Sequence, residues 1–303
     1  MTQPARRAAV DIGTNSTRLL LAHLRNGAIA PLVYQERLTR LGEGLQADGL
    51  LSEAAMTRVL HALHEYRETM VRFGAVDDVR LFATSATRDA ANRDDFLQKI
   101  EAQTGWRCRV LTGDQEARLT FLGIAGDLSP QERALICDVG GGSTEFIFTD
   151  GRKMMHAASI DVGSSRMTQR YLHADPPAAG EIEALRAFVR AQLAPTAAGA
   201  ETLVASGGTA FSLALMDLQQ PITQPWAAHG HLLTRTNLSR LTERLTAASQ
   251  AQRRDMIGLH PQRAGVITAG AIIYQEILAH FRLSSMRVSL QDILFGVLTE
   301  EKW

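Results

Sequence analysis

Two segments of the chain repeat one pattern of residues that suits the binding of phosphate and metal. The first runs from Asp11 to Arg18 and the second from Asp138 to Glu145, with Asp, Gly, Ser and Thr at the same places in both. Glycine lets the backbone approach a ligand closely and point N–H groups toward it, and the hydroxyls add donors. The Asp that begins each copy is placed to orient a metal ion or its water shell. One such turn alone could equally be a tight turn that binds no ligand. Two copies with the same spacing favour the binding of phosphate or metal.

The residues around both copies predict β-hairpins. Apolar runs at 8–10 and 19–22 flank the first copy, and runs at 134–137 and 146–148 flank the second. An apolar run, a turn of Gly and small polar residues, and a second apolar run are typical of a hairpin. The copies are too far apart for a solenoid, which indicates equivalent hairpins in two duplicated lobes.

A third Gly-rich element lies between Leu203 and Ala210. It predicts a strand that runs into Ser206-Gly207-Gly208-Thr209 and then a helix. Such a junction places a helix N-terminus against an anion. A strand–helix turn without a ligand is the alternative for this element when it is taken alone.

The intervening segments alternate in the manner of an α/β protein. Ser52 caps a predicted helix that runs to Phe73 and closes at Gly74, and Gly113 precedes another helix that carries Glu116 in its first turn. The remaining predicted elements are strands at 79–83 and 107–111 and helices at 92–103 and 179–193.

Composition limits the classes of function. The chain has 303 residues, which suits two domains, and its 32 basic and 32 acidic residues give no net charge. This balance argues against a protein that coats nucleic acid or a membrane through bulk charge. Asp11 interrupts any signal-peptide core, and the apolar stretch 264–281 is too short to span a bilayer. Cys108 and Cys137 lie in apolar runs, so we expect free thiols, a reducing compartment and a cytoplasmic protein.

The chain resembles the exopolyphosphatase and guanosine pentaphosphate phosphatase (Ppx/GppA) family, within the superfamily of actin, Hsp70 and sugar kinases. The resemblance covers nearly the whole chain and is strongest up to about residue 168. The string Asp138-Val139-Gly140-Gly141-Gly142-Ser143-Thr144-Glu145 is its most specific part. The matching stretches are 10–16, 40–45, 83–92, 113–119, 138–145 and 206–209.

The resemblance implies an α/β fold of two duplicated actin-like (ribonuclease H-like) lobes with an active-site cleft between them. Lobe I is expected at 1–122 with about 285–303, and lobe II at 123–284. Chains of this length in the family lack the additional C-terminal helical domains of long members.

The resemblance also implies the reaction and its residues. Glu116 matches the family's catalytic carboxylate, which activates the attacking water, and Asp138 and Glu145 match carboxylates that bind metal or position that water. Mg²⁺, with Mn²⁺ as a substitute, is expected at Asp11, Asp138 and Glu145, because oxygen ligands suit hard cations. The candidate phosphate-binding residues are Gly13, Thr14, Asn15, Ser16, Arg18, Arg88, Gly140, Gly141, Gly142, Ser143, Thr144, Ser206, Gly207, Gly208 and Thr209.

The charged candidate residues could also have purely structural or solvent-exposed roles. Glu116 could serve only the start of its helix, where the dipole favours a carboxylate. Lone arginines such as Arg18 and Arg88 are mostly solvated, but Arg88 follows a strand at the edge where ligands bind in open α/β sheets. The nine histidines show no metal-ligand spacing.

The chain departs from the family pattern at three places. Gln115 stands where many members have Glu, Gly265 where an acidic residue is common, and Leu294-Phe295 where an Arg-Glu pair is common. The last change removes polarity from a segment that is expected to pack on the first lobe.

The expected function is release of terminal orthophosphate from inorganic polyphosphate. A guanosine pentaphosphate 5′-phosphatase is the nearest alternative, and an ATP-dependent small-molecule kinase and a non-catalytic sensor of guanosine polyphosphates are more distant ones. Family precedent gives the expectation of a homodimer. No nucleic-acid or membrane partner is expected.

Overall fold

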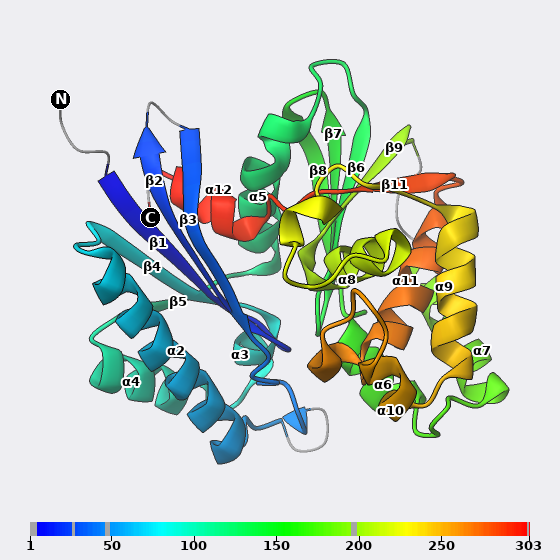
Figure 1. Cartoon of the computed structure of the whole chain (residues 1–303), viewed down its shortest axis with the longest axis horizontal. Helices are drawn as coiled ribbons and strands as arrows, with labels where there is room; N and C mark the ends of the chain where they lie inside the picture. The colour runs from blue at the N-terminus through cyan, green and yellow to red at the C-terminus, as the bar shows by residue number, and fades with distance from the viewer. Residues whose placement is uncertain (1–4, 26–27, 46–48, 195–198, 302) are drawn as a thin grey trace. The chain divides into compact units, whose positions relative to one another are not determined.

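A computed structural model describes residues 5–25, 28–45, 49–194, 199–301 and 303. The chain divides into two compact units. Unit 1 comprises the chain up to Ile124 together with Asp292–Trp303, and unit 2 comprises Ala125–Gln291. Each unit contains one mixed β-sheet (Figure 1).

The sheet of unit 1 has five strands in the order β3-β2-β1-β4-β5. Three antiparallel strands follow one another along the chain, and two further strands add in parallel to β1. The strands are β1 (Ala5–Ile12), β2 (Thr17–Arg25), β3 (Ala28–Arg37), β4 (Asp78–Ala83) and β5 (Cys108–Val110).

Helices cover both faces of this sheet (Figure 1). The helices are α2 (Glu53–Phe73), α3 (Ser85–Asp89), α4 (Arg93–Thr104), α5 (Gly113–Ile124) and α12 (Ile293–Thr299). Apolar side chains of α2 and α4, such as Met56 and Phe96, pack with Val10 and Leu19 on one face. Because side chains alternate along a strand, Ala9 and Leu20 lie on the other face, where they pack with α5 and α12.

The sheet of unit 2 has six strands in the order β10-β11-β9-β6-β7-β8. It repeats the pattern of unit 1, because β6, β7 and β8 are antiparallel and β9 and β11 add in parallel. The strands are β6 (Ala134–Val139), β7 (Thr144–Asp150), β8 (Lys153–Ile160), β9 (Thr202–Ser206), β10 (Leu232–Thr234) and β11 (Ser285–Val288).

One apolar core joins this sheet to its helices. Buried side chains from β6, β7 and β9 pack with residues of α7, α8, α9 and α11. The helices of unit 2 are α6 (Ser164–Tyr171), α7 (Ala179–Leu193), α8 (Gly207–Leu218), α9 (Arg235–Ala247), α10 (Gln250–Arg254) and α11 (Ile267–His280). Short 3-10 turns occur at η1 (Ala125–Asp127), η2 (Pro225–Ala228) and η3 (Pro261–Arg263).

The duplicated hairpins predicted from the sequence are present in two separate sheets and share one register. Asp11 pairs with Arg18 across β1 and β2, and Asp138 pairs with Glu145 across β6 and β7. The predicted helix after Ser52 is also confirmed, since the Ser52 side chain accepts a hydrogen bond from the N–H of Ala55 and Gly74 ends the helix.

The C-terminal lobe boundary differs from the prediction. Residues 285–291 were expected in the first lobe, but β11 pairs with β9 and β10 and therefore belongs to unit 2. Only the segment from Asp292 onward returns to unit 1, where Leu294 and Phe295 are buried in the core. The apolar pair found in place of an Arg-Glu pair thus fills space under the sheet.

No helix in the described part of the chain is both long and apolar enough to cross a membrane.

Candidate active site

The turn between β1 and β2 in unit 1 is held closed by its own backbone. The N–H of Gly13 donates to the carbonyl of Ser16 over 2.9 Å. Asn15 is 8% exposed, and its Nδ2 donates to no side chain or backbone group among the described residues. A buried amide donor without a protein acceptor is suited to a ligand that brings one, such as a phosphate oxygen.

A loop after β3 holds this turn in place through backbone hydrogen bonds. The N–H of Arg40 donates to the carbonyl of Asn15, and the N–H of Gly42 donates to that of Thr14, both over 2.9 Å. A Cβ at position 42 would lie 2.4 Å from the Thr14 side-chain methyl, so any larger residue would have to displace that methyl group. Arg58 of α2 donates in turn to the carbonyls of Thr39 and Arg40. The matching stretch 40–45 therefore positions the turn.

Asp11 and Arg18 form a buried ion pair. Arg18 donates from Nε to Asp11 Oδ2 over 2.9 Å, and it also pairs with Asp292, which caps the start of α12. The three side chains are nearly excluded from solvent. Burial raises the pKa of Asp11, and the Arg18 guanidinium opposes that effect. These contacts favour a structural role for Arg18 and for Asp11 Oδ2. Asp11 Oδ1 is buried with no hydrogen-bond partner among the described residues, so the metal role of Asp11 stays a prediction.

Glu116 and Arg88 lie together in unit 1. Arg88 Nη1 is 3.3 Å from Glu116 Oε2 and 2.9 Å from the carbonyl oxygen of Leu111. The side chain of Glu116 is 13% exposed and that of Arg88 is 25% exposed, so solvent reaches both. The predicted catalytic carboxylate and the predicted phosphate-facing arginine are thus neighbours, with the arginine anchored to the backbone.

The start of α5 is capped by Gln115 rather than by Glu116. The N–H of Thr112 donates to Gln115 Oε1 over 3.1 Å, and the N–H of Gln115 donates to Thr112 Oγ1 over 3.2 Å. This is a reciprocal capping arrangement in which Gln serves as well as Glu. Gln115 therefore fills the capping role that Glu would have at this position. The carboxylate of Glu116 is not needed for this cap.

The equivalent hairpin of unit 2 brings two carboxylates together. Asp138 and Glu145 are directly opposite each other, so their side chains share one face of the sheet. Glu145 is 2% exposed, and its Oε1 accepts a hydrogen bond from Ser159 Oγ over 3.0 Å. Burial raises the pKa of the Cys137 thiol, and the negative charges of Asp138 and Glu145 add to that shift.

The Gly-rich start of α8 lies beside this acidic pair. Ser206 is in register with Asp138 across β9 and β6, which places Glu145, Asp138 and Ser206 in a row across three strands. Ser206 Oγ is fully buried and has no hydrogen-bond partner among the described residues. Gly207 has φ +81°, and a Cβ there would lie 2.2 Å from Asp138 Oδ1. Glycine is therefore required for this helix start to meet the carboxylate.

Two predicted hydroxyl ligands are committed to the fold. Thr144 Oγ1 donates to the carbonyl of Val162, and Thr209 Oγ1 donates to the carbonyl of Val139 over 3.0 Å. Each hydroxyl has a single hydrogen, which is used in these bonds. Any contribution of Thr144 or Thr209 to phosphate binding would therefore come from its backbone.

The acidic pair of unit 2 fits a hard divalent cation. Mg²⁺ is commonly held by one or two carboxylates, with the rest of its shell from water and substrate phosphate. Asp138 and Glu145 supply such a pair, and like charges directly opposite on a sheet favour a cation nearby. Within the described ranges, no group of three or more His, Cys, Asp or Glu side chains is arranged to hold a metal ion.

Three arginines near these turns were not among the predicted site residues. Arg58 supports the loop after β3, Arg166 of α6 donates to the carbonyl of Gly142, and the Arg263 guanidinium lies against Gly208. Arg166 follows Gly163-Ser164-Ser165 directly after the third strand of the repeat. The corresponding segment of unit 1 is the supporting loop at 40–45. A comparison of the segments that follow the two repeats would therefore have indicated Arg166.

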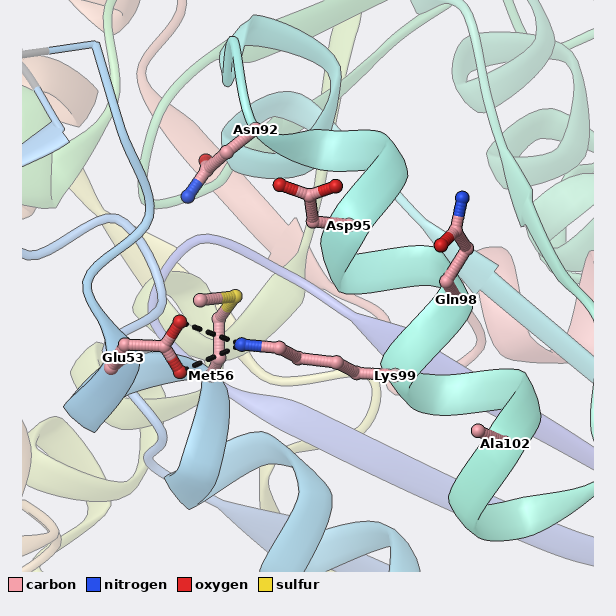
Figure 2. Close-up of a pocket in the computed structure, with 7 residues that line it drawn as sticks. All are labelled: Glu53, Met56, Asn92, Asp95, Gln98, Lys99 and Ala102. Carbon is pink, nitrogen blue, oxygen red and sulfur yellow. Dashed lines mark hydrogen bonds and ion pairs between the residues drawn. The ribbon is translucent and has the colours of Figure 1, made fainter.

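A groove of about 390 Å³ in unit 1 lies apart from all these residues. Figure 2 shows it between α2 and α4, with Lys99 paired to both carboxylate oxygens of Glu53 at 2.6 and 2.8 Å. Asn92 at one end is bonded to the backbone of Leu51. None of the predicted catalytic, metal or phosphate-binding residues lines this groove.

The fold and the two hairpins agree with the family comparisons. The family model described as Ppx/GppA phosphatase family matches residues 8–301, and the chain belongs to this family of phosphoanhydride hydrolases. The predicted family and the predicted two-lobe actin-like class of fold are thereby confirmed.

Individual relatives match over nearly the whole chain. Exopolyphosphatase 2 of Mycobacterium tuberculosis is 34% identical over 96% of this chain and 97% of its own length. A guanosine-5′-triphosphate,3′-diphosphate pyrophosphatase of Aliivibrio fischeri is 27% identical over 99% of this chain but only 60% of its own length. The crystal structure of an exopolyphosphatase from Cytophaga hutchinsonii gives a TM-score of 0.89 at 26% identity, covering 97% of this chain and 96% of that one.

Proposed function

We propose that this protein is an exopolyphosphatase that releases terminal orthophosphate from inorganic polyphosphate. The observation that carries the proposal is the match, over nearly the full length of both chains, with a relative named exopolyphosphatase 2. The geometry of Glu116 supports it, because this carboxylate is partly exposed and is not used as the cap of its helix.

In unit 1, Glu116 is proposed to accept a proton from the attacking water. Phosphoryl transfer needs little covalent chemistry, so the protein must position the water and stabilise charge on the phosphoryl oxygens. Arg88 holds the Glu116 carboxylate in place and carries a positive charge beside it. The Asn15 amide and the backbone of its turn are proposed to donate to phosphate oxygens.

In unit 2, Asp138 and Glu145 are the residues that would hold Mg²⁺ or Mn²⁺. A bound divalent cation would supply Lewis-acid stabilisation of negative charge on phosphate oxygens. The turn from Gly140 to Ser143 and the start of α8 are proposed to donate backbone N–H groups to the same kind of oxygen.

A guanosine pentaphosphate phosphatase is the second candidate. It is favoured by the Aliivibrio fischeri relative, although that protein extends well beyond the aligned region. Both substrates end in a phosphoanhydride, so the turns described above serve either one. A kinase would need a carboxylate to deprotonate an acceptor hydroxyl, and a sensor would not need Glu116, which leaves both as weaker alternatives.

We also propose a cytoplasmic homodimer. The two cysteines are free thiols, as predicted, and this suits a reducing compartment. The dimer rests on family precedent, and light scattering on the purified chain would measure its mass directly.

The direct test is phosphate release from short polyphosphate, long polyphosphate and guanosine pentaphosphate, measured in parallel. Glu116→Gln should lower kcat on the preferred substrate by roughly 10²-fold or more, because proton-transfer assistance is worth about 10²–10⁴-fold. Asp114→Asn is the matched control, since Asp114 is an exposed acid in the same first turn of α5.

Two outcomes would count against the proposal. Release from none of the three substrates would overturn the assigned reaction, and release from guanosine pentaphosphate alone would favour the second candidate. If Glu116→Gln lost no more activity than Asp114→Asn, the proton acceptor would lie elsewhere, with Glu145 as the next residue to test.

A further inference from the structure

We infer that Arg166 is a positioning residue that aims the phosphate-binding amides of the turn between β6 and β7. This inference rests on the proposed function, because it assigns a device by which that turn binds phosphate. It concerns the backbone of Gly140, Gly141 and Gly142 and the helix α6 that follows β8.

The start of α6 takes up three successive carbonyl groups of the turn. The N–H and Oγ of Ser164 donate to the carbonyl of Gly140 over 2.8 and 3.1 Å. The N–H groups of Ser165 and Arg166 donate to the carbonyl of Gly141 over 2.9 and 3.0 Å. The third carbonyl, that of Gly142, is beyond the backbone of α6 and accepts from Arg166 Nε over 2.7 Å.

These bonds fix the direction of the amides as well as the carbonyls. In a planar trans peptide the C=O of one residue and the N–H of the next point in opposite directions. Because the carbonyls of Gly140, Gly141 and Gly142 all point toward α6, the N–H groups of Gly141, Gly142 and Ser143 all point away from it. Three successive amides directed to one side form an anion-binding concavity.

Glycine at position 163 lets α6 come close enough for this arrangement. A Cβ there would lie 2.5 Å from the backbone of both Gly141 and Gly142. The helix therefore rests directly against the back of the turn, and its first N–H groups bond without an intervening side chain. Only the last carbonyl needs the reach of the arginine.

The side chain of Arg166 is built for a fixed position. It is 14% exposed, and its Nη2 is 3.7 Å from Asp161 Oδ1. Asp161 is 79% exposed, so this ion pair is weak and does not orient the turn. The hydrogen bond from the charged Arg166 side chain to the partly buried Gly142 carbonyl is stronger than this exposed ion pair.

In unit 1, the carbonyls of the equivalent turn are held by backbone N–H groups rather than by a side chain. There the carbonyls of Thr14 and Asn15 accept from the backbone N–H groups of Gly42 and Arg40. The supporting loop again follows the third strand of the repeat. The carbonyls of Asn15 and Gly142 occupy equivalent places, so Arg166 Nε in unit 2 replaces a backbone N–H in unit 1.

The test compares Arg166→Ala with Asp161→Asn, which removes the ion pair but leaves the hydrogen bond to Gly142. Hydrolysis of tripolyphosphate is measured for KM and kcat, and hydrogen–deuterium exchange is measured on the peptide that spans 140–143. For Arg166→Ala we expect a KM roughly tenfold higher, a much smaller change in kcat and faster exchange of this peptide, while Asp161→Asn resembles the wild type.

Two further variants keep the test decisive. Arg166→Gln is used if Arg166→Ala does not fold, and the same rise in KM is expected. Arg166→Lys keeps the charge but lacks a donor at the Nε position, so its KM should stay raised. Full recovery of KM by lysine would overturn the positioning role, because charge alone would then explain the effect.

The failure of this inference can be separated from the failure of the proposed function. An active wild type with equal KM and equal exchange in Arg166→Ala and Asp161→Asn would overturn the role of Arg166 alone. A wild type that hydrolyses no tripolyphosphate would overturn the proposed function. In that case calorimetric binding of tripolyphosphate replaces KM, and unchanged affinity in Arg166→Ala would overturn the inference as well.

Discussion

The hairpin of unit 1 and the hairpin of unit 2 have the same topology and register but carry residues of different charge across the ladder. Asp11 has an arginine directly across the ladder, whereas Asp138 has a glutamate there. In unit 1 the Asp is neutralised by Arg18, which also reaches Asp292 at the start of α12. In unit 2 two carboxylates share the equivalent position. The two hairpins thus differ in the residue across the ladder from the Asp. Arg18 gives unit 1 an internal ion pair, and Glu145 gives unit 2 a pair of acids suited to a cation.

The difference shows how a duplicated fold can divide its tasks. A buried ion pair fixes the end of the hairpin to the helix beneath it, because both partners need each other to remain buried. An acidic pair at the same place stabilises little by itself but can hold a positive ion and the phosphates bound to it. We therefore expect changes in the Asp11–Arg18 pair to affect mainly stability, and changes in the Asp138–Glu145 pair to affect mainly turnover.

The largest expected effect follows from Asp138→Asn. It should lower kcat by roughly 10²-fold or more, because a divalent cation supplies several kcal/mol of charge stabilisation. The thermal midpoint should change less than in Asp11→Asn, because Asp138 is only half-buried whereas Asp11 is buried. Phosphate release and thermal unfolding measured on one preparation check this. A loss of stability with full activity would mean that the two hairpins have the reverse roles.

Asp11→Asn should be the most destabilising change in this set. It removes one carboxylate of the buried pair and leaves Arg18 with its ion pair to Asp292, and breaking a buried pair costs about 3–5 kcal/mol. Urea unfolding gives the free energy, and Ser16→Ala in the same turn is a suitable control. A free energy within experimental error of the wild type would show that the pair is not structural.

Arg58→Ala tests the loop that supports the unit 1 turn. Arg58 donates to the carbonyl of Thr39 over 2.7 Å but is partly exposed, so we expect a loss of about 1–2 kcal/mol. Its effect on KM should be smaller than that of Arg166→Ala, because backbone N–H groups hold the turn itself. A larger rise in KM for Arg58→Ala would contradict the comparison of the two supports.

Lys99→Ala should have the smallest effect, because it lies in neither hairpin. Its ion pair with Glu53 is exposed and links α2 to α4, and such pairs contribute about 0.2–1 kcal/mol. Kinetic parameters should equal those of the wild type. A clear change in KM would show that the groove between α2 and α4 communicates with substrate binding.

The duplicated hairpins could be predicted from the sequence, because their geometry depends on local residue types. Gly, Ser and Thr at fixed offsets between apolar runs are enough to predict the turns, and Ser52 and Gly74 bound α2 as expected. The helix at 179–193 likewise has the predicted limits. These features depend on neighbours in the chain, which a reader of the sequence can see.

Partners distant in the sequence could not be predicted in this way. The pairing of Arg18 with Asp292 joins residues 274 positions apart, and the contact of Gly207 with Asp138 depends on strand order. The boundary at 285 was misplaced for the same reason, since β11 is a short strand that is defined by its neighbours. Position 265 is unexplained, because a Cβ there meets only ordinary contacts with Gln250.

The most direct measurement is a Mg²⁺ titration of phosphate release from tripolyphosphate by the wild type, Glu145→Gln and Asp11→Asn. The titration is made at a temperature where circular dichroism shows all three proteins folded, and excess chelator should abolish release by the wild type. We predict that Glu145→Gln needs at least about tenfold more Mg²⁺ for half-maximal activity, because one of two carboxylate ligands is lost, whereas Asp11→Asn needs the same amount as the wild type. An unchanged Mg²⁺ requirement in Glu145→Gln together with a raised one in Asp11→Asn would contradict the account.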